Sequence, residues 1–69
     1  HQLKFMSGQE YLEVFLIDQN GKVLQKSFEG QLNNGQQILS LEIHTLKAGA
    51  YYYLLKSGSR QELVSFQKL

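Results

Sequence analysis

The 69-residue sequence predicts an all-β fold, either a small antiparallel sandwich or an open barrel. Two observations support this prediction. The chain divides into short runs of β-forming residues, and most of the runs are followed by a loop that contains glycine. No apolar repeat with the 3.6-residue period of a helix extends beyond a single turn. The pattern indicates a single domain over residues 1–69, built from about six strands.

The first half of the chain contains the strongest local signal, a hairpin centred on Asn20-Gly21. A short alternating strand is predicted at residues 3–6, and a longer one at residues 11–17. Asn-Gly suits a two-residue turn, in which both residues have a positive φ. Gly adopts such a φ freely and Asn tolerates it better than most residues. The returning strand is expected at residues 22–28.

The strand at residues 11–17 has two different faces. Leu12, Val14 and Leu16 alternate on one face, which we expect to contact the core. The opposite face is also largely apolar; it comprises Tyr11, Glu13, Phe15 and Ile17. A strand that is apolar on both faces is typical of one covered on both sides.

The second half of the chain continues the β pattern. A loop at residues 29–36 is followed by an amphipathic strand at residues 37–43, and a connection at residues 44–49 leads onward. Residues 50–57 favour a strand strongly because they contain three consecutive tyrosines and two leucines. Residues 61–69 form the predicted last strand.

The composition excludes several classes of protein. The net charge is +1 with interspersed signs, so the clustered positive face that nucleic acid requires is absent from the sequence. No apolar run approaches the ~18 residues of a membrane-spanning helix, so membrane insertion is not expected. The chain has no Cys, and its two histidines, His1 and His44, are too few for a metal site of their own.

Three local patterns, taken together and in order, resemble one protein family. They are Val14-x-Leu16-x-Asp18-x-x-Gly21-Lys22-Val23, then Leu41-x-Ile43-x-x-Leu46-x-x-Gly49-x-Tyr51, then a final Phe66-x-Lys68-Leu69. From about Leu12 to its end, the chain resembles the C-terminal sorting domain of type IX secretion cargo proteins from the Bacteroidetes, in its type A-like form. Each pattern alone is weak, whereas the ordered set is considerably more specific.

The resemblance implies an immunoglobulin-like antiparallel β-sandwich of six to seven strands, without catalytic residues or a cofactor. It implies a signal domain at the end of a larger cargo protein, exported through the periplasm and outer membrane to the cell surface or the medium. The implied partners are the type IX translocon, a sortase-like protease and the N-terminal cargo domain of the same chain. One departure is the absence of Pro, because the family usually opens with a Pro-Asn-Pro-like segment. The start of this chain is therefore either trimmed or divergent.

The last strand is the first candidate for recognition. A strand at a chain end often lies at a sheet edge, where its N–H and C=O groups can pair with another protein. The resemblance implies that the translocon reads this element; the candidate residues are Leu63, Val64, Phe66, Lys68 and Leu69. The alternative is an ordinary closing strand whose edge is kept soluble by Lys68. The loops around Gly21 and Gly58 are the next candidates.

A second group of residues is expected to serve the fold as turn and core landmarks. This group comprises Asp18, Asn20, Gly21, Lys22, Leu46, Gly49 and Tyr51. Asp18 is expected to accept hydrogen bonds from backbone amides across its turn, since one Asp supplies too few oxygens for calcium. Gly49 is expected to adopt the left-handed conformation at the start of the next strand, while Leu46 and a tyrosine fill the core.

Three other functions remain open. The chain could be a carbohydrate-binding or fibronectin-like accessory module, with Tyr52 or Phe15 stacking on a sugar. The doubly apolar second strand is compatible with a structural spacer or an oligomerisation domain. An enzyme is the least expected class, because His44 cannot be combined with a base or nucleophile in any recognisable catalytic arrangement.

Overall fold

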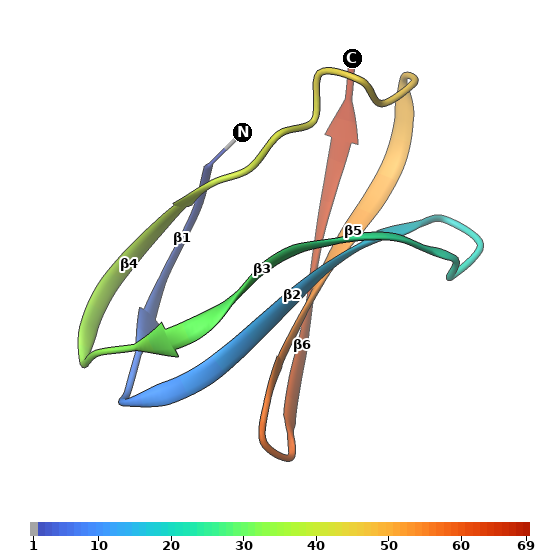
Figure 1. Cartoon of the computed structure of the whole chain (residues 1–69). Coiled ribbons are helices and arrows are strands. Elements are labelled where there is room, and N and C mark those ends of the chain that lie inside the picture. The colour runs from blue at the N-terminus through green and yellow to red at the C-terminus, as the bar shows by residue number, and fades with distance from the viewer. Residues whose placement is uncertain (1) are drawn as a thin grey trace.

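The structure is a computed structural model that describes residues 2–69. His1, considered above as a metal ligand, lies outside the described residues. The strands are β1 (Gln2–Ser7), β2 (Glu10–Asp18), β3 (Val23–Leu32), β4 (Gly35–Ser40), β5 (Gly49–Ser57) and β6 (Arg60–Lys68). They form two antiparallel sheets (Figure 1), so the predicted all-β sandwich is confirmed.

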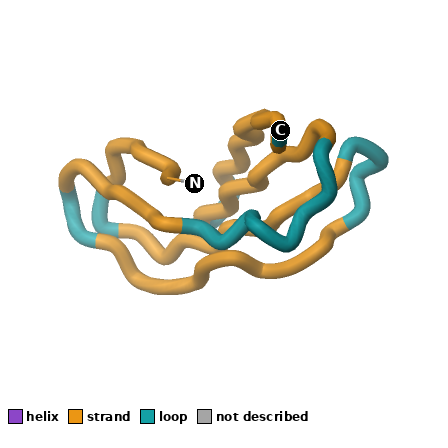
Figure 2. Tube along the Cα trace, turned by 90° about the horizontal axis from the view of Figure 1, so that it is seen from above, coloured by secondary structure: helices purple, strands orange, loops and turns teal. Residues whose placement is uncertain are grey.

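The two sheets differ in width. The larger one has the strand order β3-β2-β5-β6, and the smaller one contains only β1 and β4. In Figure 2 the described chain consists of strands and loops alone, so no helix long enough to cross a membrane occurs in it. β1 begins at the end of the molecule where β6 finishes (Figure 1), and β6 is an edge strand of the larger sheet.

The core lies between the two sheets. Leu12, Val14 and Leu16 of β2 are at most 3% exposed, which confirms the predicted core face of that strand. Tyr53 and Leu55 of β5 lie beside them, because the register pairs Tyr53 with Leu16 and Leu55 with Val14. The core is completed by Leu3 from β1, Leu32 from the end of β3 and Leu41 from the loop after β4.

The prediction of a loop at residues 29–36 is wrong for residues 29–32. β3 continues to Leu32, which is buried, and the connection to β4 is reduced to Asn33 and Asn34. Pairing with β2 keeps residues 29–32 extended, and Gly30 leaves room for the ring of Phe28. A Cβ at Gly30 would lie 3.3 Å from that ring.

The strand predicted at residues 37–43 also differs from the structure. β4 begins two residues earlier and ends at Ser40, so Leu41 and Ile43 lie in the following loop. Both still pack on the core, and the loop turns where the N–H of Leu46 donates to the carbonyl of Ile43 at 3.0 Å. The alternation of apolar residues therefore correctly indicated which side chains are buried. The strand itself, however, ends at Ser40.

Candidate functional site

β6 lies at an edge of the larger sheet, as the last strand was predicted to do. It pairs with β5 from Ser57↔Arg60 to Gly49↔Lys68. Within residues 2–69 no strand pairs with its other side. The outer backbone groups of β6 are therefore oriented toward a position where a further strand could pair.

The five predicted recognition residues divide between two environments. Val64 and Phe66 are half-buried and pack against the core. Leu63 is on the opposite face and is 61% exposed, and Leu69 is 99% exposed at the chain end. Lys68 is half-exposed beside it. Leu63 and Leu69 are thus the exposed members of the set, Lys68 has the same intermediate burial as Val64 and Phe66, and the latter two attach the strand to the domain.

Aromatic stacking provides that attachment. The ring of Phe66 is stacked on Tyr53, with centroids 4.8 Å apart, and on Tyr51, with centroids 5.7 Å apart. Tyr53 is fully buried, and its burial raises the pKa of its hydroxyl. Tyr51 and Tyr53 share the core face, whereas Tyr52 is half-buried on the other face, as the alternation predicted.

The hairpin at Asn20-Gly21 is present, but the predicted two-residue turn is wrong. Gly21 has a φ of 85°, while Asn20 has a negative φ, so the turn does not belong to the predicted type. The carboxylate of Asp18 organises a four-residue connection instead, because its Oδ1 accepts the N–H groups of Asn20 and Lys22 at 2.9 Å each. The predicted role of Asp18 is confirmed.

The segment Leu46-x-x-Gly49-x-Tyr51 connects the loop to β5. Gly49 has a φ of 153° and opens the strand, a positive φ that residues with a Cβ rarely adopt. The Tyr51 hydroxyl donates to the carbonyl of Lys47 at 2.7 Å, and Leu46 packs against the core. These landmarks hold the loop before β5 against the sandwich.

The prediction of a strand covered on both sides is confirmed only at Ile17, which is 9% exposed; the rest of the outer face of β2 is not buried, and Tyr11 is 51% exposed. A polar cluster instead shields part of it. Lys26 Nζ lies 2.8 Å from Glu29, 3.1 Å from Glu13 and 5.6 Å from the centroid of the Phe15 ring. The Tyr11 hydroxyl donates to Glu29 in a short hydrogen bond.

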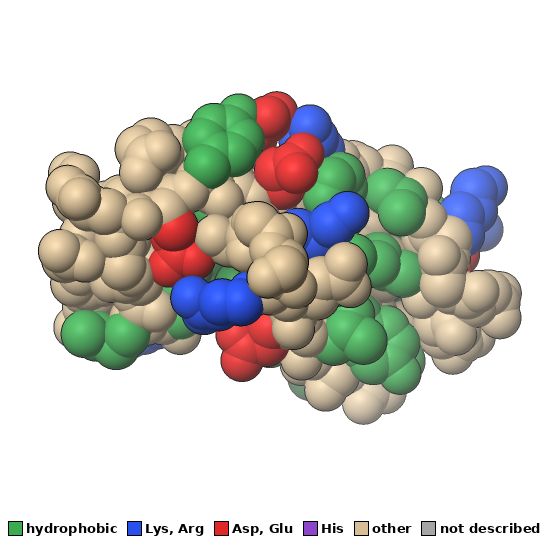
Figure 3. Space-filling model, turned by 90° about the horizontal axis from the view of Figure 1, so that it is seen from below, with side chains coloured by type: hydrophobic (Ala, Val, Ile, Leu, Met, Phe, Trp, Pro, Cys, Tyr) green, Lys and Arg blue, Asp and Glu red, His purple; other side chains and the backbone are tan. Residues whose placement is uncertain are grey.

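The charges of this cluster shift the pKa values of its members. The hydrogen bonds from Lys26 and Tyr11 lower the pKa of Glu29, and those to Glu29 and Glu13 raise the pKa of Lys26. Seen from below in Figure 3, acidic and basic side chains are interspersed rather than gathered by sign. That arrangement offers no extended positive surface on the side shown.

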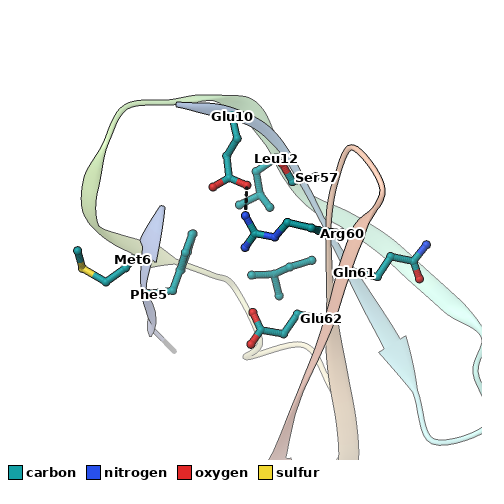
Figure 4. A pocket seen from close by; sticks show the side chains of 9 residues that line it. Phe5, Met6, Glu10, Leu12, Ser57, Arg60, Gln61 and Glu62 are labelled. Atoms are coloured by element: carbon teal, nitrogen blue, oxygen red, sulfur yellow. Dashed lines mark hydrogen bonds and ion pairs between the residues drawn. The ribbon is translucent and has the colours of Figure 1, made fainter. Parts of the chain in front are cut away.

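A groove between β1 and β6 is a feature that the sequence analysis missed. It has a volume of about 320 Å³ and is lined by Phe5, Met6, Glu10, Leu12, Leu55, Ser57, Arg60, Gln61 and Glu62. Arg60 Nη1 lies 3.5 Å from Glu10 Oε1 in this groove (Figure 4). The hydrogen bonds from Ser57 and the Gly8 N–H, with the charge of Arg60, lower the pKa of Glu10. Alternation along β6 would have placed Arg60 and Glu62 on one face with Val64.

His44 is the one histidine among residues 2–69. His44 Nδ1 lies 2.6 Å from Glu42 in an exposed pair on the loop before β5. Among residues 2–69 no cluster of three or more potential metal-ligating side chains occurs.

Comparison with known proteins identifies a family. The family model of the secretion system C-terminal sorting domain matches residues 1–68, essentially the whole chain. The match supports the sorting function and gives no support to the carbohydrate-binding alternative. No curated protein and no solved structure matches the chain. The chain belongs to the secretion system C-terminal sorting domains, the signals that direct cargo proteins through the type IX secretion system to the cell surface or the medium.

Proposed function

We propose that the translocon of the type IX system recognises this domain through the end of β6. The observation that supports this most directly is the position of β6 as an edge strand whose last residue, Leu69, is almost fully exposed. An edge strand can extend its sheet with a strand of another protein, which gives affinity through backbone hydrogen bonds. Leu63 and Lys68 would add side-chain specificity on that strand.

Val64 and Phe66 have a supporting role in this proposal. Both are half-buried on the core face of β6, so they hold the strand in place while the exposed residues are read. The proposal assigns no catalytic role to the domain itself. Residues 1–69 act as one signal domain at the end of a cargo chain, and a sortase-like protease of the outer membrane removes it after export.

The test is a fluorescent reporter fused to the domain and expressed in a host with an active type IX system. Deleting Lys68 and Leu69 is expected to leave the reporter in the periplasm, and Leu63→Ser is expected to reduce its export. Ile38→Ser is the matched control, since Ile38 is 55% exposed on β4 and Leu63 is 61% exposed on β6. Thermal unfolding of the purified fusions must show that every variant remains folded.

Full export of the folded Lys68–Leu69 deletion would show that the end of β6 is not the signal. If Leu63→Ser and Ile38→Ser reduce export equally, export depends on the exposed apolar area of the domain and not on the position of Leu63 in β6. The protease is tested separately by determining the C-terminus of the exported reporter. That terminus is expected to lie before the domain, and an intact domain on the exported protein would argue against processing.

A further inference from the structure

β1 has one edge that is not paired with another described strand. β1 pairs with β4 along all six of its residues, and in the described part of the chain no strand lies on its other side. Because the smaller sheet has two strands and the larger one four, the smaller sheet leaves part of the larger uncovered. The groove lies in that uncovered region, between the end of β1 and the start of β6.

The groove combines an apolar floor with charged walls. Leu12 and Leu55, which are 3% and 6% exposed, contribute to it from the core. In Figure 4 Phe5 of β1 points toward the groove from one side, and Arg60 and Glu62 of β6 point toward it from the other. Met6 and Gln61, the residues next to these on their strands, point away from it (Figure 4).

The side chains on the core face of β6 change from apolar to charged at the groove. Val64 and Phe66 occupy that face farther along the strand, and Glu62 and Arg60 continue it where the smaller sheet no longer covers it. Arg60 is 3.5 Å from Glu10, whereas Glu62 has no ion pair with any described residue. Two carboxylates therefore face one guanidinium, which leaves the groove with one excess negative charge.

We propose that this groove receives an extended segment of a partner polypeptide, which pairs with the free edge of β1 as a third strand of the smaller sheet. Side chains of an added strand alternate, so residues two apart share the face toward the floor. The segment would place an apolar side chain over Leu12 and Leu55 and a Lys or Arg two residues away, beside Glu62. β1 has six residues, which sets the length of the paired segment.

This surface is separate from the C-terminal end of β6, and Leu63, which adjoins Glu62, points to the opposite face of the strand. Glu62 and Leu69 are seven residues apart on a strand, which corresponds to about 23 Å. A change at the groove therefore leaves the exposed end of β6 unaltered. The proposal does not depend on how the translocon reads Leu69, and either proposal can fail without the other.

The test is NMR titration of the isotopically labelled domain with a capped probe peptide, Ser-Val-Thr-Lys-Thr-Val-Ser, whose Val and Lys side chains share one face. The peptide is expected to shift the β1 amides and the Leu12 and Leu55 methyl groups at concentrations up to about 5 mM. A second probe carries Glu in place of Lys. It is expected to bind about fivefold more weakly, the size expected for one exposed ion pair.

Glu62→Lys in the domain is expected to reverse this preference between the two probes. Glu42→Lys is the matched control, because it makes the same charge change on the exposed loop before β5. The proposal is overturned if neither probe shifts β1, or if both variants change binding equally. It is also overturned if sedimentation shows that the domain dimerises through Glu62, since a second copy would then occupy the groove.

Discussion

Phe66 lies nearly parallel to Tyr53, with an interplanar angle of 17° and 4.8 Å between the ring centroids. The contact joins the edge strand β6 to the central strand β5, which contributes the most deeply buried tyrosine of the molecule. Since β6 has a strand partner on one side only, side-chain packing is needed to hold its end on the sheet. The stability of the core and the presentation of the C-terminus are therefore coupled through one ring.

Replacing Phe66 with Ala should destabilise the domain. A fully buried Phe→Ala change costs ~3–5 kcal/mol, and the half-buried position of Phe66 lowers the expected loss in unfolding free energy to about 2 kcal/mol. Urea denaturation followed by circular dichroism would measure it. Gln67→Ala, on the exposed face of the same strand, should change that free energy by less than about 0.5 kcal/mol. Equal effects of the two variants would mean that the stack does not stabilise β6.

Removing the carboxylate of Asp18 should weaken the β2–β3 hairpin. Asp18→Ala deprives the N–H groups of Asn20 and Lys22 of their acceptor. Hydrogen bonds to a charged group contribute ~1.5–3 kcal/mol, so a loss near the lower end, about 1.5 kcal/mol, is expected at this exposed turn. Asp18→Asn keeps an oxygen acceptor and should restore about half of the loss. If Asn behaves like Ala in thermal unfolding, the two amides do not depend on this side chain.

The same turn shows where local reasoning succeeds and where it stops. Asn20-Gly21 correctly located the hairpin, because the dipeptide marks a reversal between two β runs. The backbone conformation was wrong because a side chain two residues before Asn20 accepts the amide hydrogens. Dipeptide preferences do not include such a competing acceptor, although Asp18 itself was correctly expected to bind amides across the turn.

Strand alternation predicted the burial of side chains better than the limits of strands. Leu12, Val14 and Leu16 are buried as expected, and Leu41 is buried although it lies outside β4. Pairing depends on partners far apart in the sequence, such as Leu3 with Leu39. Periodicity in one segment cannot supply this information. The groove was missed for the same reason, since its lining residues come from β1, β2, β5 and β6, which only the folded chain brings together.

Removing the Tyr51 hydroxyl should loosen the loop before β5. Tyr51→Phe retains the ring stacked on Phe66 but loses the hydrogen bond to the Lys47 carbonyl. The expected loss in unfolding free energy is about 1 kcal/mol. Hydrogen exchange should show faster exchange at the Leu46 amide, which donates within this loop. Tyr52→Phe is the control, because the Tyr52 hydroxyl has no hydrogen bond with residues 2–69 in the structure; identical exchange in both variants would contradict the proposed role.

The cluster of Lys26 and Glu29 should make stability depend on pH in the acid range. The pKa of Glu29 is lowered in the folded state below its ordinary value of 4.5, chiefly by Lys26. A carboxyl with a depressed pKa stabilises the fold above the unfolded-state pKa, and this contribution is lost as the pH falls through the folded-state pKa. Glu29→Gln should therefore be slightly less stable than the parent at pH 7, and the difference should shrink steadily below pH 4.5.

The control for Glu29→Gln is the loss of a carboxylate that has no ion pair with a lysine. Glu62→Gln removes an exposed carboxylate that forms no ion pair with the described residues, so it should change the stability at pH 7 less than Glu29→Gln does. About 1 M salt should reduce the Glu29→Gln difference at pH 7, because the Debye length then falls to ~3 Å and exposed charges are screened. A Glu29→Gln difference that persists undiminished well below pH 4.5 would show that Glu29 acts through packing or its hydrogen bond to Tyr11, and that its charge contributes nothing.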